Sequence, residues 1–99
     1  MDFPEISQIQ RAWDMNCHRF KKGAIPRELA RYMVTGILYP NKNGYISITH
    51  AHDVLEDNFC NFDNIRYTLS ATAKALKQVT KVFGMKWVHG YGMKWTFTE

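Results

Sequence analysis

Apolar residues recur at helical spacing along the first part of the chain, over about residues 4–22. An apolar side chain returns every three or four positions, at Ile6, Ile9, Trp13, Cys17 and Phe20. Pro4 is well placed in the first turn of a helix, and Gly23 can provide a left-handed cap at its end. The spacing predicts one amphipathic helix over this whole segment.

A second helical segment begins at Pro26 and is expected to stop before Pro40, because the residue preceding a proline is disfavoured in helical conformation. Its apolar stripe consists of Leu29, Tyr32, Met33, Gly36 and Ile37. Residues 41–44 (NKNG) are turn-formers, and residues 45–48 (YISI) favour a short strand.

A third helix is expected directly after this strand. Ser47 or Thr49 can cap it by accepting a hydrogen bond from a free N–H group of the first turn. The stripe expected to be buried consists of Ala51, Val54, Leu55 and Phe59. Residues 60–64 (CNFDN) then interrupt the pattern with turn-formers.

The fourth helical segment has the clearest periodicity. Asp63 could cap it early, or Thr68 or Ser70 could cap it late, and the pattern leaves these starts open. The apolar face consists of Leu69, Ala73, Leu76, Val79 or Thr80, and Phe83. The polar side chains off this face are Ser70, Thr72, Lys74, Lys77, Gln78 and Lys81. Gly84 ends the helix.

The last segment, residues 85–98, alternates apolar and polar side chains on either side of two glycines that flank Tyr91. This pattern predicts a β-hairpin. We expect Trp87 and Trp95 to lie in the core rather than to serve as base-stacking platforms. Tyr91 at the turn is harder to bury.

The composition fits one soluble domain. The chain has 99 residues, of which 45% are hydrophobic and 14% aromatic. It has no apolar run of the ~20 residues that a membrane span needs, and its acidic N-terminus does not resemble a signal peptide. We therefore expect a cytoplasmic protein that does not associate with membranes.

Charge is distributed unevenly along the chain. Residues 1–62 carry seven basic and seven acidic side chains, whereas residues 63–99 carry six basic and two acidic ones. The whole net charge of +4 therefore belongs to the second segment. Such asymmetry favours a surface that faces a polyanion, because neutralisation of phosphates by Lys and Arg drives nucleic-acid binding.

Metal-binding and catalytic patterns are not apparent. His50 and His52, together with Cys60 or the Cys17–His18 pair, match no zinc spacing. Residues 50–53 (HAHD) lack a paired carboxylate or a nucleophile. We expect no enzyme activity, no cofactor and no small-molecule ligand, and we expect Cys17 and Cys60 to stay reduced.

The order of expected elements resembles the winged helix-turn-helix family over about residues 25–99. The resemblance is strongest in residues 68–79 (TLSATAKALKQV) and the hairpin that follows. It implies an α+β, mainly helical fold in one domain, residues 1–99. An extra N-terminal helix (1–23) would precede a winged-helix core (25–99) whose β-hairpin wing spans residues 85–98. The connection from Cys60 to about Tyr67 is longer than the family's customary short turn.

The resemblance implies that the fourth helix enters the major groove of DNA while the wing contacts its backbone or minor groove. The slim start of this helix and its hydrogen-bonding side chains suit that role. The residues expected to contact DNA are Asn64, Arg66, Ser70, Thr72, Lys74, Lys77, Gln78, Lys81, Lys86, His89, Tyr91 and Lys94.

These features favour sequence-specific binding of double-stranded DNA by a transcriptional regulator or by the DNA-binding domain of a phage or plasmid replication initiator. A homodimer is expected, because most such proteins read two half-sites. The leading alternative is a winged-helix module that binds a protein, for example a mobile-element inhibitor of a host factor. A metal-dependent nuclease domain is the second alternative.

Overall fold

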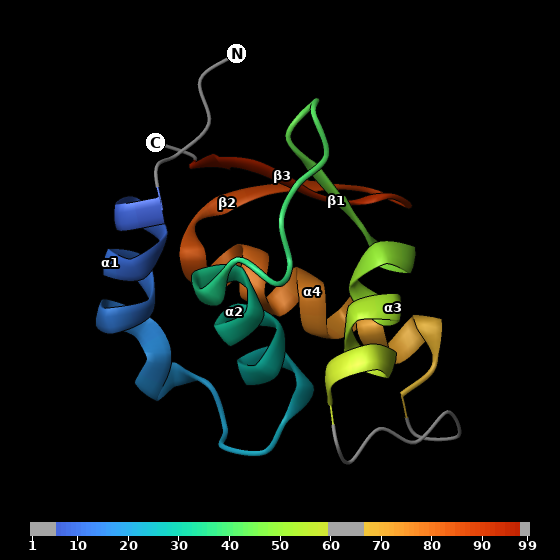
Figure 1. Ribbon diagram of the computed structural model, residues 1–99, viewed down its shortest axis with the longest axis horizontal. Helices are drawn as coiled ribbons and strands as arrows, with labels where there is room; N and C mark the ends of the chain where they lie inside the picture. The colour runs from blue at the N-terminus through green and yellow to red at the C-terminus, as the bar shows by residue number, and fades with distance from the viewer. Residues whose placement is uncertain (1–5, 60–66, 98–99) are drawn as a thin grey trace.

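The computed structural model describes residues 6–59 and 67–97, which form a mainly helical α+β domain (Figure 1). Its elements are α1 (Ile6–Asn16), the 3₁₀ helix η1 (Cys17–Arg19), α2 (Ile25–Thr35), β1 (Tyr45–Ser47), α3 (Ile48–Asn58), α4 (Leu69–Phe83), β2 (Met85–Val88) and β3 (Gly92–Phe97). The three strands form an antiparallel sheet on one side of the helices, and α4 packs against the other helices and both hairpin strands. Within these residues, every helix is too short or too polar to cross a bilayer.

The N-terminal helix is shorter than the sequence pattern predicts. It ends at Asn16, whose side-chain amide donates to the Ala12 carbonyl (2.9 Å) and so competes for a backbone acceptor of the helix. The Arg27 guanidinium donates to the Cys17 carbonyl (2.7 Å), and the chain then extends at Phe20. Phe20 thereby turns into the core, where tertiary packing overrides the continuous helical stripe.

The second helix ends earlier than expected. Gly36 adopts the left-handed conformation (φ +83°) and its N–H donates to the Met33 carbonyl, which terminates α2 at Thr35, five residues before Pro40. The turn leaves Ile37 exposed and buries Leu38 instead. The prediction that Ile37 belongs to the buried stripe is therefore wrong.

Capping side chains fix the starts of α3 and α4. Ser47 accepts a hydrogen bond from His50 N (3.0 Å), and Thr68 accepts one from Ala71 N (3.2 Å). The structure thus selects the later start of α4, and Asp63 lies outside the described residues. The expected apolar stripe of α3 is confirmed, since Ala51, Val54, Leu55 and Phe59 are all buried.

The register of α4 corrects its expected face at Leu69 and Thr72, and Ala73 of that face is only partly buried. Leu76, Val79, Thr80 and Phe83 are buried as predicted. Leu69, however, is 51% exposed, whereas Thr72 is completely buried. Thr72 shares the face of Leu76 and Val79, and the packing of α4 against the sheet and the helices leaves that face no access to solvent.

The sheet has the order β1-β3-β2, so that the first strand pairs with the last. Ile46 lies opposite Met93, and Trp87 lies opposite the same residue from the other side. Ile46, Met93 and Trp95 are buried, and Trp87 packs partly buried against the core. The expected strand and hairpin are both confirmed. Trp95 takes the core role expected of it, whereas Trp87 is only partly buried against the core.

Candidate nucleic-acid interface

The solvent-facing side of α4 carries a row of polar and basic side chains. Ser70, Lys74, Lys77, Gln78 and Lys81 are all exposed. They recur at steps of three, four and one residues, so they share one broad face of the helix. Around Ser70 the helix carries only short side chains apart from Leu69, which keeps its first turns narrow.

A groove runs between the N-terminal half of α4 and the hairpin turn. It has a volume of about 310 Å³ and is lined by Ile48, Ser70, Ala73, Lys74, Lys77, Trp87, His89 and Gly90. Four of the residues expected to contact DNA thus lie together, from two elements separated in sequence: Ser70, Lys74, Lys77 and His89. The partly buried Trp87 is anchored in the core and gives the groove a rigid apolar wall.

The segment that contains α4 and the hairpin carries basic side chains and no acidic ones. Residues 69–97 contain five lysines and no acidic residue. None of these lysines forms an ion pair with a carboxylate among residues 6–59 and 67–97. On α2, by contrast, Arg31 pairs with Glu28 (2.7 Å), and this hydrogen bond raises the pKa of Arg31. Within the described ranges, the lysine charges of α4 are therefore not neutralised by a carboxylate.

One expected contact residue is ruled out. Thr72 is completely buried, and its Oγ1 has no hydrogen-bond partner in the described part of the chain. A side chain without solvent access cannot reach a base edge. The sequence placed it on the polar side because threonine is polar, but its helical position belongs to the core face.

Other expected contact residues lie away from the groove. Lys86 and Lys94 are cross-strand neighbours on the outer face of the sheet, opposite the face that packs on α4. The Lys94 ammonium lies 5.7 Å from the centre of the Tyr45 ring. Gln78 and Lys81 continue the α4 face beyond the groove lining, and Asn64 and Arg66 lie outside the described residues.

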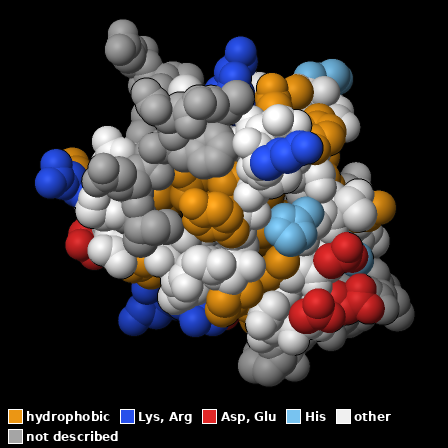
Figure 2. All heavy atoms as spheres, turned by 45° about the horizontal axis from the view of Figure 1, so that its top comes forward, with side chains coloured by type: hydrophobic (Ala, Val, Ile, Leu, Met, Phe, Trp, Pro, Cys, Tyr) orange, Lys and Arg blue, Asp and Glu red, His pale blue; other side chains and the backbone are white. Residues whose placement is uncertain are grey.

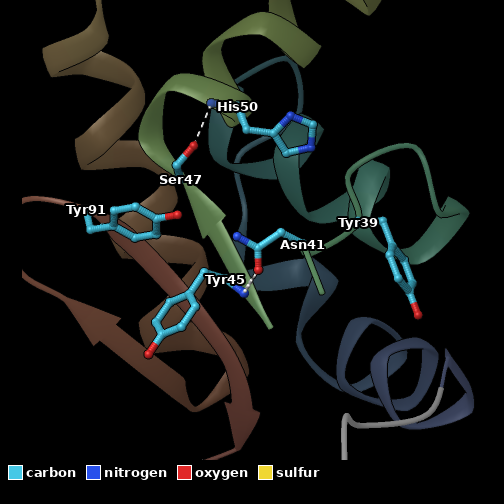
Figure 3. A pocket seen from close by; sticks show the side chains of 6 residues that line it. All are labelled: Tyr39, Asn41, Tyr45, Ser47, His50 and Tyr91. Carbon is cyan, nitrogen blue, oxygen red and sulfur yellow. Dashed lines mark hydrogen bonds between the residues drawn. The ribbon is translucent and has the colours of Figure 1, made fainter. Parts of the chain in front are cut away.

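A second cavity, which the sequence pattern did not indicate, lies on the other side of the hairpin turn (Figure 3). It has a volume of about 280 Å³ and is lined by Tyr39, Asn41, Tyr45, Ser47, His50 and Tyr91. Of these residues, only Tyr91 was expected to contact DNA. The pairing of β1 with β3 brings Tyr45 next to Tyr91. Tyr39 comes from the segment after α2, and its ring packs against Trp95 of β3.

The surface around this side of the molecule is mixed in character. Figure 2 shows hydrophobic side chains exposed across one face, with Lys and Arg side chains scattered around them and acidic side chains gathered at the lower right beside a histidine. Exposed large hydrophobic side chains include Tyr39 and Tyr91.

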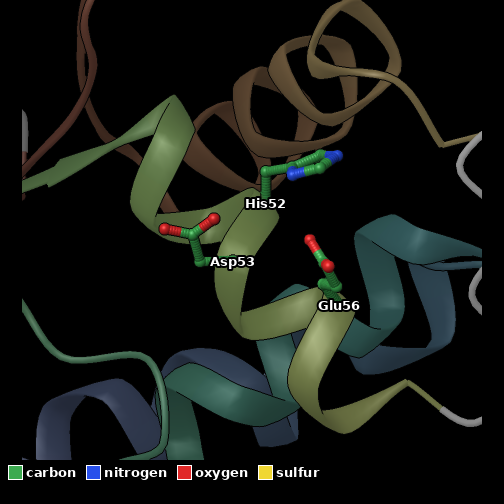
Figure 4. Close-up of side chains that lie close together, drawn as sticks. All are labelled: His52, Asp53 and Glu56. Atoms are coloured by element: carbon green, nitrogen blue, oxygen red, sulfur yellow. The ribbon is translucent and has the colours of Figure 1, made fainter.

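One group of side chains in the described residues has the composition of a metal site. Ligand atoms of His52, Asp53 and Glu56 on α3 lie within 4.8 Å of one another (Figure 4). His52 Nε2 donates to the Tyr67 carbonyl (3.0 Å). Both carboxylates are exposed, and such groups are common on helices without a metal, so this arrangement alone does not define a metal centre.

The combinations considered from the sequence joined His52 to His50 and to cysteines, and not to Asp53 and Glu56. The pattern His-Asp-x-x-Glu on a helix was the signal that could have indicated them, since positions i and i+4 share a face. Cys60 lies outside the described residues, and Cys17 is a half-buried thiol far along the chain.

Comparisons of the chain with protein-family models, with curated proteins and with solved structures gave no match.

Proposed function

We propose that this chain is a winged helix-turn-helix domain that binds double-stranded DNA through α4 and the β2–β3 hairpin. The order α2-β1-α3-α4-β2-β3, with β1 paired to β3, supports the proposal because that order is the one the family resemblance implies. In this proposal α4 is the recognition helix and the short hairpin turn is the wing.

The observation that carries the proposal is the groove between α4 and the hairpin. A helix that enters a major groove needs short side chains near its start and cations that flank them at phosphate positions. Ser70 and Ala73 provide the first, and Lys74 and Lys77 the second. Gln78 lies on the same exposed face and can read an adenine edge through its amide.

The role in the cell follows from this proposal in two forms. The domain acts as a transcriptional regulator or as the DNA-binding part of a replication initiator, in the cytoplasm. A homodimer would allow it to read two half-sites.

A duplex-binding titration with substituted proteins tests the proposal. Lys77→Ala is expected to weaken binding to all duplex sequences about equally, because it removes a phosphate contact. Gln78→Ala is expected to cost ~1–3 kcal/mol only on the preferred sequence, obtained by selection from a random duplex pool. Arg11→Ala, which removes an exposed cation from α1 outside the groove, is the matched control and should leave affinity unchanged. Equal effects of Lys77→Ala and Arg11→Ala would contradict the proposal.

A protein-binding module remains the second candidate, favoured by the exposed Met15 on α1. This candidate predicts weak binding to DNA of any sequence, and insensitivity of that binding to Gln78→Ala.

A further inference from the structure

The cavity beside the hairpin turn is bordered by three tyrosine rings from three separate segments. Tyr39 follows α2, Tyr45 begins β1 and Tyr91 closes the hairpin turn. Tyr45 and Tyr91 meet edge to face, with ring centres 5.5 Å apart and planes at 90°. Tyr39 and Tyr91 are 50% and 42% exposed. The Tyr45 and Tyr91 rings therefore offer aromatic surface at a fixed mutual angle, whereas the centre of the Tyr39 ring lies 5.9 Å from that of Trp95.

Oriented polar groups complete the lining. Asn41 Oδ1 accepts hydrogen bonds from Asn43 N (2.9 Å) and Tyr45 N (3.0 Å), which fixes the orientation of the side-chain amide. Its amide nitrogen points into the space between the Tyr91 and Ser47 side chains (Figure 3). The pocket thus combines aromatic surfaces with a positioned N–H donor, the combination that recognises a planar ring with a polar edge.

The charge near the pocket favours an anionic ligand. No carboxylate lines it, and Lys94 lies over the outer side of Tyr45. Lys42 is exposed in the same turn as Asn41 and Asn43. A neighbouring hollow of about 430 Å³ is also lined by Asn41, Tyr45 and Tyr91. The rings of Tyr45 and Tyr91 therefore border both hollows.

The pocket and the α4 groove border the same hairpin turn and the same junction of β1 with α3. The groove lining includes Ile48 and Gly90, and the residues next to them in sequence, Ser47 and Tyr91, line the pocket. Ile48 N donates to the Tyr91 carbonyl (2.8 Å), which ties the hairpin turn to the start of α3. A nucleic-acid strand that leaves the groove across the turn would reach the tyrosines directly.

We propose that this tyrosine pocket receives an unpaired base of a strand that leaves the duplex bound by α4 and the hairpin. The preferred ligand is then a junction between double-stranded and single-stranded DNA rather than a blunt duplex. This inference rests on the proposed function only in that α4 and the hairpin bind the double-stranded part of the junction. Stacking on an aromatic side chain is tolerant of base identity, so the pocket adds affinity for the junction without adding sequence preference.

The test compares a blunt duplex with the same duplex carrying a short single-stranded extension. We expect the extension to raise affinity at least ~5-fold, the lower limit for one stacked base. Tyr39→Ala should abolish this gain and leave affinity for the blunt duplex unchanged, because Tyr39 does not line the α4 groove. Tyr39→Phe should retain the gain, since it keeps the ring. A 2-aminopurine base in the extension should lose fluorescence on binding the wild type and not on binding Tyr39→Ala.

The outcomes separate the two proposals. Normal blunt-duplex binding with no gain from the extension overturns the pocket inference and leaves the duplex proposal standing; the exposed tyrosines would then belong to a protein contact. Binding of the single strand alone that Tyr39→Ala removes, without binding of the blunt duplex, supports the pocket and contradicts the duplex proposal. Thermal melts of both Tyr39 variants control for folding.

Discussion

Replacing Gly92 by alanine is expected to disrupt the sheet that positions the hairpin turn. Gly92 begins β3 and lies opposite Ser47 in β1. An added Cβ would overlap the backbone oxygen of Ile46 and lie 3.0 Å from the Ser47 Cα. Both are backbone atoms, so no side-chain rotation can relieve the overlap, and β1 must move away from β3.

The magnitude follows from what must move. Overpacking of this kind typically costs ~1–3 kcal/mol, and the separation of β1 weakens ladder hydrogen bonds worth about 1 kcal/mol each. We therefore expect Gly92→Ala to lower the free energy of unfolding by about 3 kcal/mol or more. Gly90→Ala is the matched control: φ is +75°, but nothing lies within 4 Å of the added Cβ. It should cost only ~1–2 kcal/mol, the penalty of a left-handed conformation.

Thermal and urea unfolding followed by circular dichroism measure both variants. In a domain of this size 1 kcal/mol shifts Tm by about 4–8 °C. Gly90→Ala should therefore lower Tm by roughly 4–16 °C, and Gly92→Ala should lower it further or prevent folding. If Gly92→Ala is as stable as Gly90→Ala, the close approach of β1 to β3 is wrong.

One further substitution and two pairs of substitutions test local features of the fold. Thr72→Val removes a buried hydroxyl that lacks a partner among the described residues. The substitution should leave the free energy of unfolding unchanged or raise it by about 1 kcal/mol, and it should leave DNA affinity unaltered. A loss of stability would show that the hydroxyl is bonded. Ser47→Ala removes the cap of α3 and should lower the free energy of unfolding by ~1 kcal/mol. Thr49 is exposed, so Thr49→Ala should change it by no more than about 0.5 kcal/mol. Similar losses for both variants would place the cap elsewhere. Leu38→Ala should cost ~2–5 kcal/mol in urea unfolding and Ile37→Ala much less, because only Leu38 is buried; the reverse order would contradict the observed end of α2.

The elements were predictable where an apolar stripe alone determines them. The stripe of α3 and the alternation of the hairpin both match the structure because each element presents one face to the core. The helix ends were less predictable, since they depend on distant contacts. The first helix stops where Arg27 of α2 bonds the Cys17 carbonyl, and no local pattern contains that contact.

The candidate site was predictable in its charge and not in its geometry. The excess of lysine in residues 69–97 is visible in the sequence. The three lysines of α4, Lys74, Lys77 and Lys81, are exposed as expected. The prediction that Thr72 is exposed is wrong because a threonine can occupy a helix position that faces the core, and Thr72 is buried there. The tyrosine pocket was not predictable because Tyr45 and Tyr91 become neighbours only through the pairing of β1 with β3.

The salt dependence of duplex binding tests the central claim most directly. If Lys74, Lys77 and Lys81 each neutralise one phosphate, the logarithm of the association constant should fall with the logarithm of salt concentration with a slope of roughly −2.7, at ~0.9 per contact. The double substitution Lys74→Ala/Lys77→Ala should reduce the slope to roughly −0.9. A slope that the double substitution leaves unchanged would contradict the assignment of α4 as the DNA-binding surface.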